Sequence, residues 1–472
     1  MNQNIPLWQW SACDLAAGIK NKEFSCREAV TSVLERMQAK NPELNAVVID
    51  LSEQALAQAE HADDMVQSGV QLGPMHGVPM TVKVNVDLKG HPNTNGLKAL
   101  ANFIAPDDSP VVRNLKKAGA IIFGITNTPE FSMRMMTDNP LYGLTKNPWQ
   151  ADFTCGGSSG GSASAVSAGI GPVAHGNDIG GSLRIPAFCC GIFAIRPTLG
   201  RVPAYNPSQI DERALAAQLF SVQGPLAREV RDIRLALAAM AQRDVHDPWW
   251  VPVPLEGPAL VKPVKVAVTK SPAGTTPHPV IAQAIDTAAQ HLAEAGYAVE
   301  TVEAPFSEEL SELWKSLLFS EMRQLLQQSI DDYGSDAIRT FLESCYESTQ
   351  FLDKQGYMRG LMARTRILRE WLLFLEDYPL VLAPLLLKPS YKVDEDLEGG
   401  ENGLEVVSTL LPSYSINALG LPAAAVPMGL HEGVPYGLQI VGQRFREDMC
   451  LDAAEVIERK VGILPQQLWE KF

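Results

Sequence analysis

The chain has 472 residues, and its 39 lysines and arginines against 54 aspartates and glutamates give a formal net charge of −15. This acidic balance argues against binding to nucleic acid or to an anionic membrane surface. Seven cysteines are scattered without a Cys-x-x-Cys pair, and neither a signal-peptide pattern nor a run of 18 apolar residues occurs. We therefore expect a soluble, cytoplasmic protein with reduced thiols that acts on a small, uncharged or mildly polar molecule.

Helix and strand patterns alternate along the first half of the chain. Ser25 and Glu28 form a capping box, after which apolar residues recur at helical spacing. Pro110, which follows a serine, starts a second predicted helix, and Gly119 ends it. The apolar run 120–123 that follows has the pattern of a buried strand. This order is typical of α/β layers.

The same alternation continues in the second half. Residues 263–269 and 297–302 have strand patterns and enclose a helix predicted over 279–296. Residues 313–375 are mostly helical by pattern, and no internal repeat or long low-complexity linker interrupts the chain. Short buried strands are predicted at 379–384, 423–429 and 437–442, and a final helix is marked by Met449, Ala453, Val456 and Ile457.

Two serine-glycine clusters lie between Gly156 and Ser182. Ser158 is in the first cluster, and Ser182 follows 24 residues later in the second. Glycine allows backbone N–H groups to approach a ligand closely. Consecutive N–H donors beside a hydroxyl suit the stabilisation of the oxyanion that forms when that hydroxyl attacks a carbonyl. We therefore predict that Ser182 is a nucleophile.

Lys83 is the candidate base for this serine. It lies in the apolar run GVPMTVKV. The pKa of an exposed lysine is roughly 10.4, and burial lowers it, which frees the lone pair of the amine near neutral pH. Taken alone, such a lysine is more often a surface residue, or one whose stem packs on apolar neighbours, than a base.

The glycine-rich stretch has three other interpretations. A flexible linker would not be expected to continue into the small-residue run 162–171, which has the pattern of a packed helix. A phosphate-binding loop would end in Gly-Lys-Ser or Gly-Lys-Thr, which is absent. A nucleophile elbow centred on Ser159 requires a downstream acid and histidine, and no histidine lies in a motif. Because no pair of histidines has zinc-binding spacing, we predict no metal site.

Six motifs occur in order along the chain: GVPMTVKVNVDLKG, GAIIFGITNTPEF, TDNPLYGLTKNPW, DIGGSLRIPAFCCGIFAIRPTLGRVP with the serine-glycine region before it, GPLAREVRD and GLPAAAVPMGL. Taken together, they resemble the amidase signature family of serine hydrolases. Their order and spacing carry the resemblance, which covers most of the chain. It implies an α/β protein made of a single α/β/α domain over 1–472, with a mixed, twisted central sheet. A catalytic core at about 70–205 and a variable, helical substrate-side region at about 305–400 are also implied.

The resemblance implies a catalytic set of Lys83, Ser158 and Ser182. Lys83 would take a proton from Ser158, Ser158 would take one from Ser182, and Ser182 Oγ would attack the amide carbonyl. An acyl-enzyme would follow, and an activated water would release the acid. No metal or cofactor is required by this chemistry.

Further residues are implied to support this set. The family has a cis peptide before Ser158, and Gly157 makes that bond less crowded. Asp178 and Arg184 would buttress the glycine loop without taking part in bond chemistry. The oxyanion hole would be formed by the N–H groups of Ile179, Gly180, Gly181 and Ser182.

The sequence departs from the family pattern at two positions near this set. Val84 replaces the acid that commonly follows the lysine, and Asn177 replaces the small hydroxyl residue common before the aspartate. Loss of the acid should ease deprotonation of Lys83, because a neighbouring negative charge favours the ammonium form. A group of large side chains, Phe131, Met133, Met135, Met136 and Tyr142, fits the hydrophobic core better than an acyl pocket.

The implied function is hydrolysis of the carbon-nitrogen bond of a small amide, with esters, anilides or carbamates as further substrates. The alternative is the glutamine-hydrolysing subunit of a transfer-RNA amidotransferase, which also belongs to the family. Residues 366–384 resemble stand-alone amidases, which favours the first function. The helical region could determine the substrate or equally form an inert packing layer or an oligomer surface, so a homodimer is compatible with the sequence.

Overall fold

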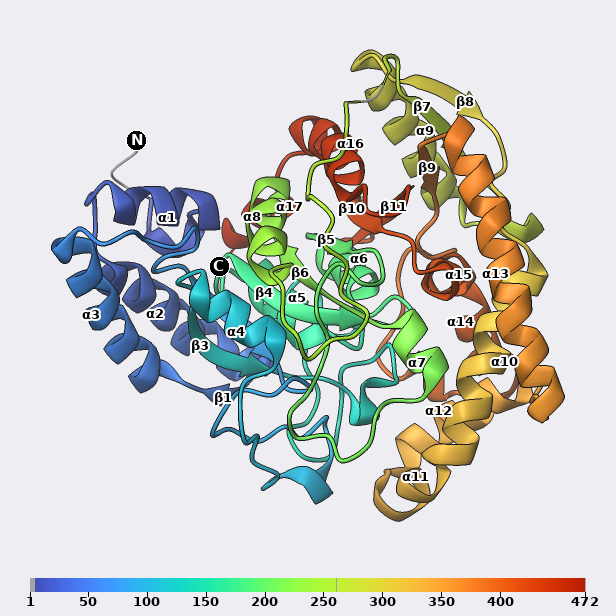
Figure 1. Cartoon of the computed structure of the whole chain (residues 1–472), viewed down its shortest axis with the longest axis horizontal. Coiled ribbons are helices and arrows are strands. Elements are labelled where there is room, and N and C mark those ends of the chain that lie inside the picture. The colour runs from blue at the N-terminus through green and yellow to red at the C-terminus, as the bar shows by residue number, and fades with distance from the viewer. Residues whose placement is uncertain (1–4, 260, 472) are drawn as a thin grey trace.

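The computed structural model describes residues 5–259 and 261–471, which form one 11-stranded sheet. Helices lie on both sides of this sheet (Figure 1). The strands are β1 (Val47–Asp50), β2 (Pro79–Lys83), β3 (Ile121–Thr126), β4 (Val173–Asp178), β5 (Phe193–Arg196), β6 (Val222–Ala227), β7 (Lys265–Val268), β8 (Ala298–Thr301), β9 (Leu380–Ala383), β10 (Ala423–His431) and β11 (Val434–Gly442). Their order in the sheet is β1-β3-β2-β4-β6-β5-β10-β11-β9-β7-β8.

The sheet is mixed. Strands β3, β2 and β4 are mutually parallel, as are β9, β7 and β8, whereas every pair from β4 through β6, β5, β10 and β11 to β9 is antiparallel. Because β2 and β4 are parallel neighbours, their carboxyl ends lie at the same edge of the sheet. Lys83 is the last residue of β2 and Asp178 the last of β4, so the fold brings these two positions together.

Helices cover both faces, in agreement with the α/β/α layers that the family resemblance implied. Along β9, Leu380 and Leu382 belong to one apolar cluster, while Val381 and Ala383 belong to a second cluster on the opposite face. The helices are α1 (Ala12–Lys20), α2 (Cys26–Leu44), α3 (Ser52–Ser68), α4 (Pro110–Lys117), α5 (Gly160–Ser167), α6 (Arg184–Cys190), α7 (Leu215–Phe220), α8 (Val230–Met240), α9 (Pro279–Glu294), α10 (Glu308–Leu325), α11 (Gln327–Tyr333), α12 (Asp336–Glu347), α13 (Lys354–Asp377), α14 (Gly400–Thr409), α15 (Leu411–Leu419), α16 (Glu447–Val461) and α17 (Leu464–Trp469).

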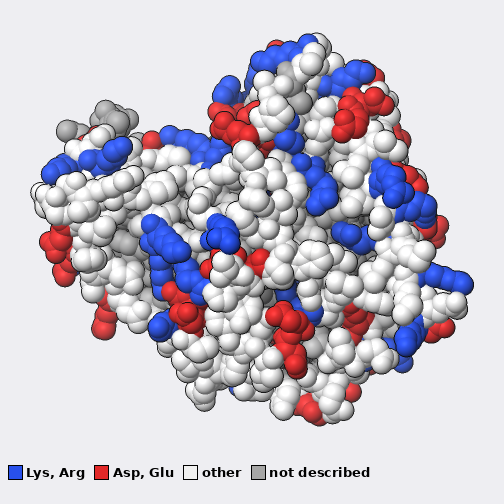
Figure 2. All heavy atoms as spheres, viewed as in Figure 1, with Lys and Arg blue, Asp and Glu red and all other residues white. Residues whose placement is uncertain are grey.

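The predicted helical stretch 313–375 is confirmed as the layer α10–α13. Its buried apolar side chains belong to the second cluster, to which α7, α14, α15 and strands of the sheet also contribute. Figure 1 shows α13 at the end of the molecule opposite α3. Within the described residues, no helix combines the length and the apolar character needed to cross a bilayer. On the face drawn in Figure 2, basic and acidic side chains are interspersed.

Local signals placed several element ends correctly. Ser25 and Glu28 form the capping box that starts α2, and Pro110 occupies the first turn of α4. The strands predicted at 423–429 and 437–442 exist, but each is longer than predicted. β10 and β11 have nine residues each and form an antiparallel hairpin, whose turn contains Gly433 at φ +81°.

The prediction of a last helix around Met449 is wrong in one respect. That helix, α16, is followed by the six-residue α17. Gly462 at φ +78° ends α16, and Pro465 lies in the first turn of α17. Six residues are too few to show a helical period, and Trp469 is held by tertiary contact, since its ring packs edge-on against Trp8 at 5.1 Å.

Candidate active site

Lys83 is fully buried at the end of β2, where its amine meets three side-chain oxygens. Its Nζ lies 2.7 Å from Ser158 Oγ, 2.8 Å from Asn177 Oδ1 and 3.2 Å from Ser159 Oγ. Burial lowers the pKa of Lys83 well below its ordinary value, and the negative charge of Asp178 acts in the opposite direction. The neutral amine that a base requires is therefore favoured at this position.

Ser158 lies in the loop before α5, and the Gly157–Ser158 peptide bond is cis, as the family resemblance implied. The loop packs tightly on the preceding segment. A Cβ at Gly157 would lie 2.3 Å from Arg134 O and 2.7 Å from Met135 C, both backbone atoms. The Ser158 carbonyl accepts a hydrogen bond from Thr128 Oγ1 at 2.9 Å. Glycine is therefore required at position 157 for this close approach.

Ser182 lies in the turn between β4 and α6, next to the loop that carries Ser158. Its backbone carbonyl accepts a hydrogen bond from the Ser159 N–H at 3.2 Å, which ties the two glycine-rich loops together. Ser158 and Lys83 are buried, whereas Ser182 is partly exposed. Of the three residues predicted as the catalytic set, Ser182 is thus the one that a substrate can approach.

The glycine loop before Ser182 presents backbone donors in two directions. The Gly181 N–H donates to Asp178 Oδ1 at 2.8 Å. Among the described residues, the N–H groups of Ile179, Gly180 and Ser182 meet no hydrogen-bond acceptor. Three of the four predicted oxyanion-hole donors are thus unpaired, and the fourth is directed to the carboxylate. Their role in stabilising an oxyanion stays a prediction.

Asp178 and Arg184 form a buried ion pair beneath this loop. Arg184 Nε donates to Asp178 Oδ2 at 3.0 Å, and both side chains are completely buried. Burial acts to raise the pKa of Asp178, but the Arg184 guanidinium holds it well below its usual value, so the carboxylate is charged. Asn417 on α15 donates to the same carboxylate at 2.8 Å, and Gln439 on β11 accepts from Arg184 at 2.7 Å. The network therefore joins the loop to both the helical layer and the sheet.

Trp314 on α10 is a neighbour of the loop that the sequence analysis did not identify. Its Nε1 donates to the Ile179 carbonyl at 2.9 Å, and its ring stacks on Tyr414 at 4.8 Å. A Cβ at Gly180 would lie 2.8 Å from Trp314 Cζ2, so the indole ring lies directly against the glycine loop. No local signal marks a tryptophan inside a mostly helical stretch as a site residue.

The remaining predicted residues near the site are placed as follows. Val84 is completely buried in the main apolar cluster, so position 84 carries no charge and no polar contact to Lys83. Met135 and Met136 are buried in that cluster, whereas Phe131 and Met133 are partly buried against the second cluster. Within residues 5–259 and 261–471, no group of three or more His, Cys, Asp or Glu side chains is arranged to hold a metal ion.

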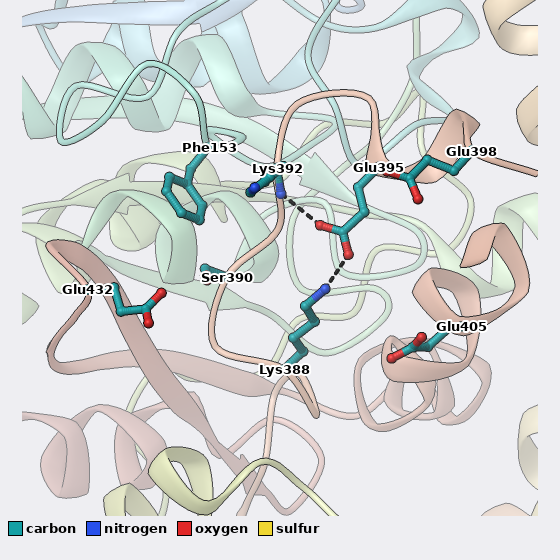
Figure 3. A pocket seen from close by; sticks show the side chains of 8 residues that line it. All are labelled: Phe153, Lys388, Ser390, Lys392, Glu395, Glu398, Glu405 and Glu432. Carbon is teal, nitrogen blue, oxygen red and sulfur yellow. Dashed lines mark hydrogen bonds and ion pairs between the residues drawn. The ribbon is translucent and has the colours of Figure 1, made fainter.

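A separate pocket of about 440 Å³ lies on another part of the surface (Figure 3). It is lined by charged side chains, among which Glu395 binds the Lys388 ammonium and the Lys392 N–H. None of Lys83, Ser158 and Ser182 lines it. It is therefore distinct from the candidate active site.

Comparison with known proteins identifies the family of this chain. The sequence profile described as Amidase matches residues 28–451. The indoleacetamide hydrolase of Bradyrhizobium diazoefficiens is 50% identical over 466 residues, which cover 98% of this chain and 89% of that protein. A glutamyl-tRNA(Gln) amidotransferase subunit from Moorella thermoacetica is 31% identical over 96% of this chain and 97% of its own length.

Solved structures agree with this assignment. A bacterial aryl acylamidase of the amidase signature family superposes with a TM-score of 0.83 at 29% identity, covering 99% of each chain. A 6-aminohexanoate cyclic dimer hydrolase, in complex with its substrate, gives a TM-score of 0.84 at 27% identity over 98% of this chain and 100% of that chain. The chain belongs to the amidase signature family. It is an amidase, an enzyme that hydrolyses amide bonds.

Proposed function

We propose that this amidase hydrolyses the primary amide of a small aryl acetamide, with indoleacetamide as the first candidate, to give the carboxylic acid and ammonia. The observation that carries this proposal is the 50% identity, over 98% of the chain, to a protein named indoleacetamide hydrolase. The Trp314 ring supports it, because this ring gives the glycine loop before Ser182 an aromatic wall, which suits a substrate with an aryl group.

The proposed chemistry begins with the neutral amine of Lys83. Lys83 accepts the proton of Ser158, Ser158 accepts that of Ser182, and Ser182 Oγ forms a bond to the amide carbon. N–H groups of the 179–182 loop bind the resulting oxyanion, each donor contributing roughly 3 kcal/mol in the transition state. When the carbon-nitrogen bond breaks, the proton returns through the same hydroxyls to the nitrogen and ammonia leaves. Water then attacks the acyl-enzyme and releases the acid.

The second candidate is glutamine hydrolysis within a transfer-RNA amidotransferase. The 31% identity to the Moorella amidotransferase protein over nearly the whole chain is the observation that favours it. The two functions differ in what the isolated chain does, because a stand-alone amidase needs no partner. The weaker identity and the aromatic wall place this function second.

The test is release of ammonia and of the corresponding acid by the purified chain from indoleacetamide, an anilide and free glutamine. We expect turnover of indoleacetamide without partners. Ser182→Ala should lower kcat by at least about 10³-fold, because the attacking atom is lost. Ser164→Ala is a matched control, since this buried serine on α5 bonds only the Lys146 carbonyl and should leave kcat unchanged. Turnover of glutamine alone would contradict the proposal.

Two further expectations accompany this function as proposals. We place the enzyme in the cytoplasm, which is supported by seven cysteines that are all free. A homodimer is one proposed state of the chain, and light scattering on the purified protein tests it.

A further inference from the structure

Two asparagine side chains near Lys83 form a reciprocal pair. Asn177 lies on β4, and Asn85 follows β2 by two residues. Asn177 Nδ2 donates to Asn85 Oδ1 at 2.7 Å, and Asn85 Nδ2 lies 3.3 Å from Asn177 Oδ1. Asn177 Oδ1 also accepts from Lys83 Nζ at 2.8 Å. The pair thus connects the catalytic lysine to the loop after β2.

Hydrogen bonds outside the pair agree with the direction in which each carboxamide points. Asn85 Nδ2 donates to Ser132 Oγ at 2.9 Å, and Ser132 Oγ donates to Asn95 Oδ1 at 2.6 Å. Asn85 thus presents its Oδ1 to Asn177 Nδ2 at 2.7 Å, and Asn177 presents its own Oδ1 to Lys83 Nζ at 2.8 Å. A carbonyl oxygen can accept but cannot donate, so Asn177 must take an N–H of the lysine.

Counting the donors of Lys83 then leaves one arrangement for its lone pair. A neutral amine has two N–H groups and one lone pair. One N–H goes to Asn177 Oδ1, and the second goes to Ser159 Oγ at 3.2 Å, whose own proton is directed to the Asn177 carbonyl at 3.3 Å. The lone pair remains for the O–H of Ser158, 2.7 Å away. This is the orientation in which Lys83 can accept the proton of Ser158.

We propose that Asn177, held by Asn85, is a positioning residue that aims the Lys83 lone pair at Ser158. The inference deepens the proposed function and rests on it. A carboxamide can do this without a negative charge, whereas an acid at the same place would favour the ammonium form. It also assigns Ser159, which the nucleophile-elbow interpretation made the attacking residue, to the orientation of the base.

The charged surroundings of Lys83 are simple enough for its titration to report on Asn177. Asp178 and His175, both on β4, are the titratable neighbours that act on it. Burial lowers the pKa of His175 to about 4, so it is neutral at working pH, and Asp178 is charged throughout. The other packed elements, β3 and α5, carry no titratable side chain, and the buried residues of α2 are apolar apart from the Cys26 thiol.

The experiment measures the rate at which a fluorophosphonate probe labels Ser182 as a function of pH, which needs no substrate. In Asn177→Asp the new carboxylate should raise the midpoint of the acid limb by at least one pH unit. Asn177→Ala should lower the plateau rate at least tenfold, because the amine loses its fixed orientation. Asn85→Ala, which leaves the Lys83 contact in place but frees Asn177, should lower the plateau several-fold.

Asn114→Asp and Asn114→Ala are the matched controls. Asn114 is a buried asparagine on α4, and its amide donates to the carbonyls of Met240 and Gln242 rather than to Lys83. These variants should not move the midpoint. The proposal would be overturned if Asn177→Asp folds and its labelling rate has the wild-type pH midpoint. If Asn177→Asp does not fold, an unchanged plateau rate of labelling in Asn85→Ala would overturn it. Labelled wild type without indoleacetamide turnover would refute the proposed substrate alone, and no labelling at Ser182 would refute the catalytic set.

Discussion

Replacing Asp178 by asparagine should destabilise the folded protein by about 3–5 kcal/mol, the range for breaking a buried ion pair on one side. The carboxylate accepts from five groups: two on Arg184, one on Asn417, and the N–H groups of Gly181 and Leu183. In asparagine, one oxygen becomes an NH₂ group that faces donors. Arg184 is completely buried and would keep its charge without a partner, and Arg196 Nε, 3.9 Å away, would lose its nearest carboxylate.

The assay is equilibrium unfolding in urea, with the free energy of unfolding compared between variant and wild type. Asp14→Asn is the control, because the Asp14–Arg231 pair has the same chemistry but side chains 44% and 48% exposed. An exposed pair contributes at most about 1 kcal/mol, so this variant should stay close to wild type. If Asp178→Asn also stayed within about 1 kcal/mol of wild type, the network would not hold the loop as we describe.

Three further predictions address the loop, the aromatic wall and the pH dependence. Gly157→Ala should lower kcat at least tenfold, because the alanine Cβ would lie only 2.3 Å from the Arg134 carbonyl oxygen. A steady-state rate equal to that of the wild type would contradict the close packing of this loop on the segment around Arg134. Trp314→Phe keeps an aromatic ring but removes the donor to the Ile179 carbonyl. We expect the free energy of unfolding to fall by about 1–3 kcal/mol and kcat on indoleacetamide to fall as well. An unchanged kcat would show that this ring does not support the glycine loop. Burial lowers the pKa of His175 from 6.5 to about 4, so the unfolded chain binds this proton more tightly and stability falls as pH drops through that window. Between pH 7.5 and pH 5, the free energy of unfolding of His175→Gln should therefore fall by about 2 kcal/mol less than that of the wild type. Equal decreases in urea unfolding would count against a buried, neutral imidazole at position 175.

Local chemistry in the sequence was sufficient to predict many elements and to mark Ser182 and Lys83 as candidates, whereas Ser158 was added by the family resemblance. The Ser25–Glu28 capping box and Pro110 mark helix starts because they act within one turn. The glycines around Ser158 and Ser182 signal close backbone approach, which depends on the absence of a Cβ at each position. The apolar neighbours of Lys83 in the sequence were compatible with a buried amine of lowered pKa, but only the structure shows that this side chain is buried.

The tertiary structure decided how distant segments meet at this site. Asn417 and Gln439 reach the Asp178–Arg184 pair from more than 200 residues away in sequence, and Trp314 covers Gly180 from a helix whose pattern indicates only burial. Ser132, from a third segment, accepts a hydrogen bond from Asn85 beside the Asn85–Asn177 pair. Strand order, with β6 and β5 placed between β4 and β10, depends on which faces are buried together. Such pairings follow from contacts between segments remote in sequence, and no local residue pattern encodes them.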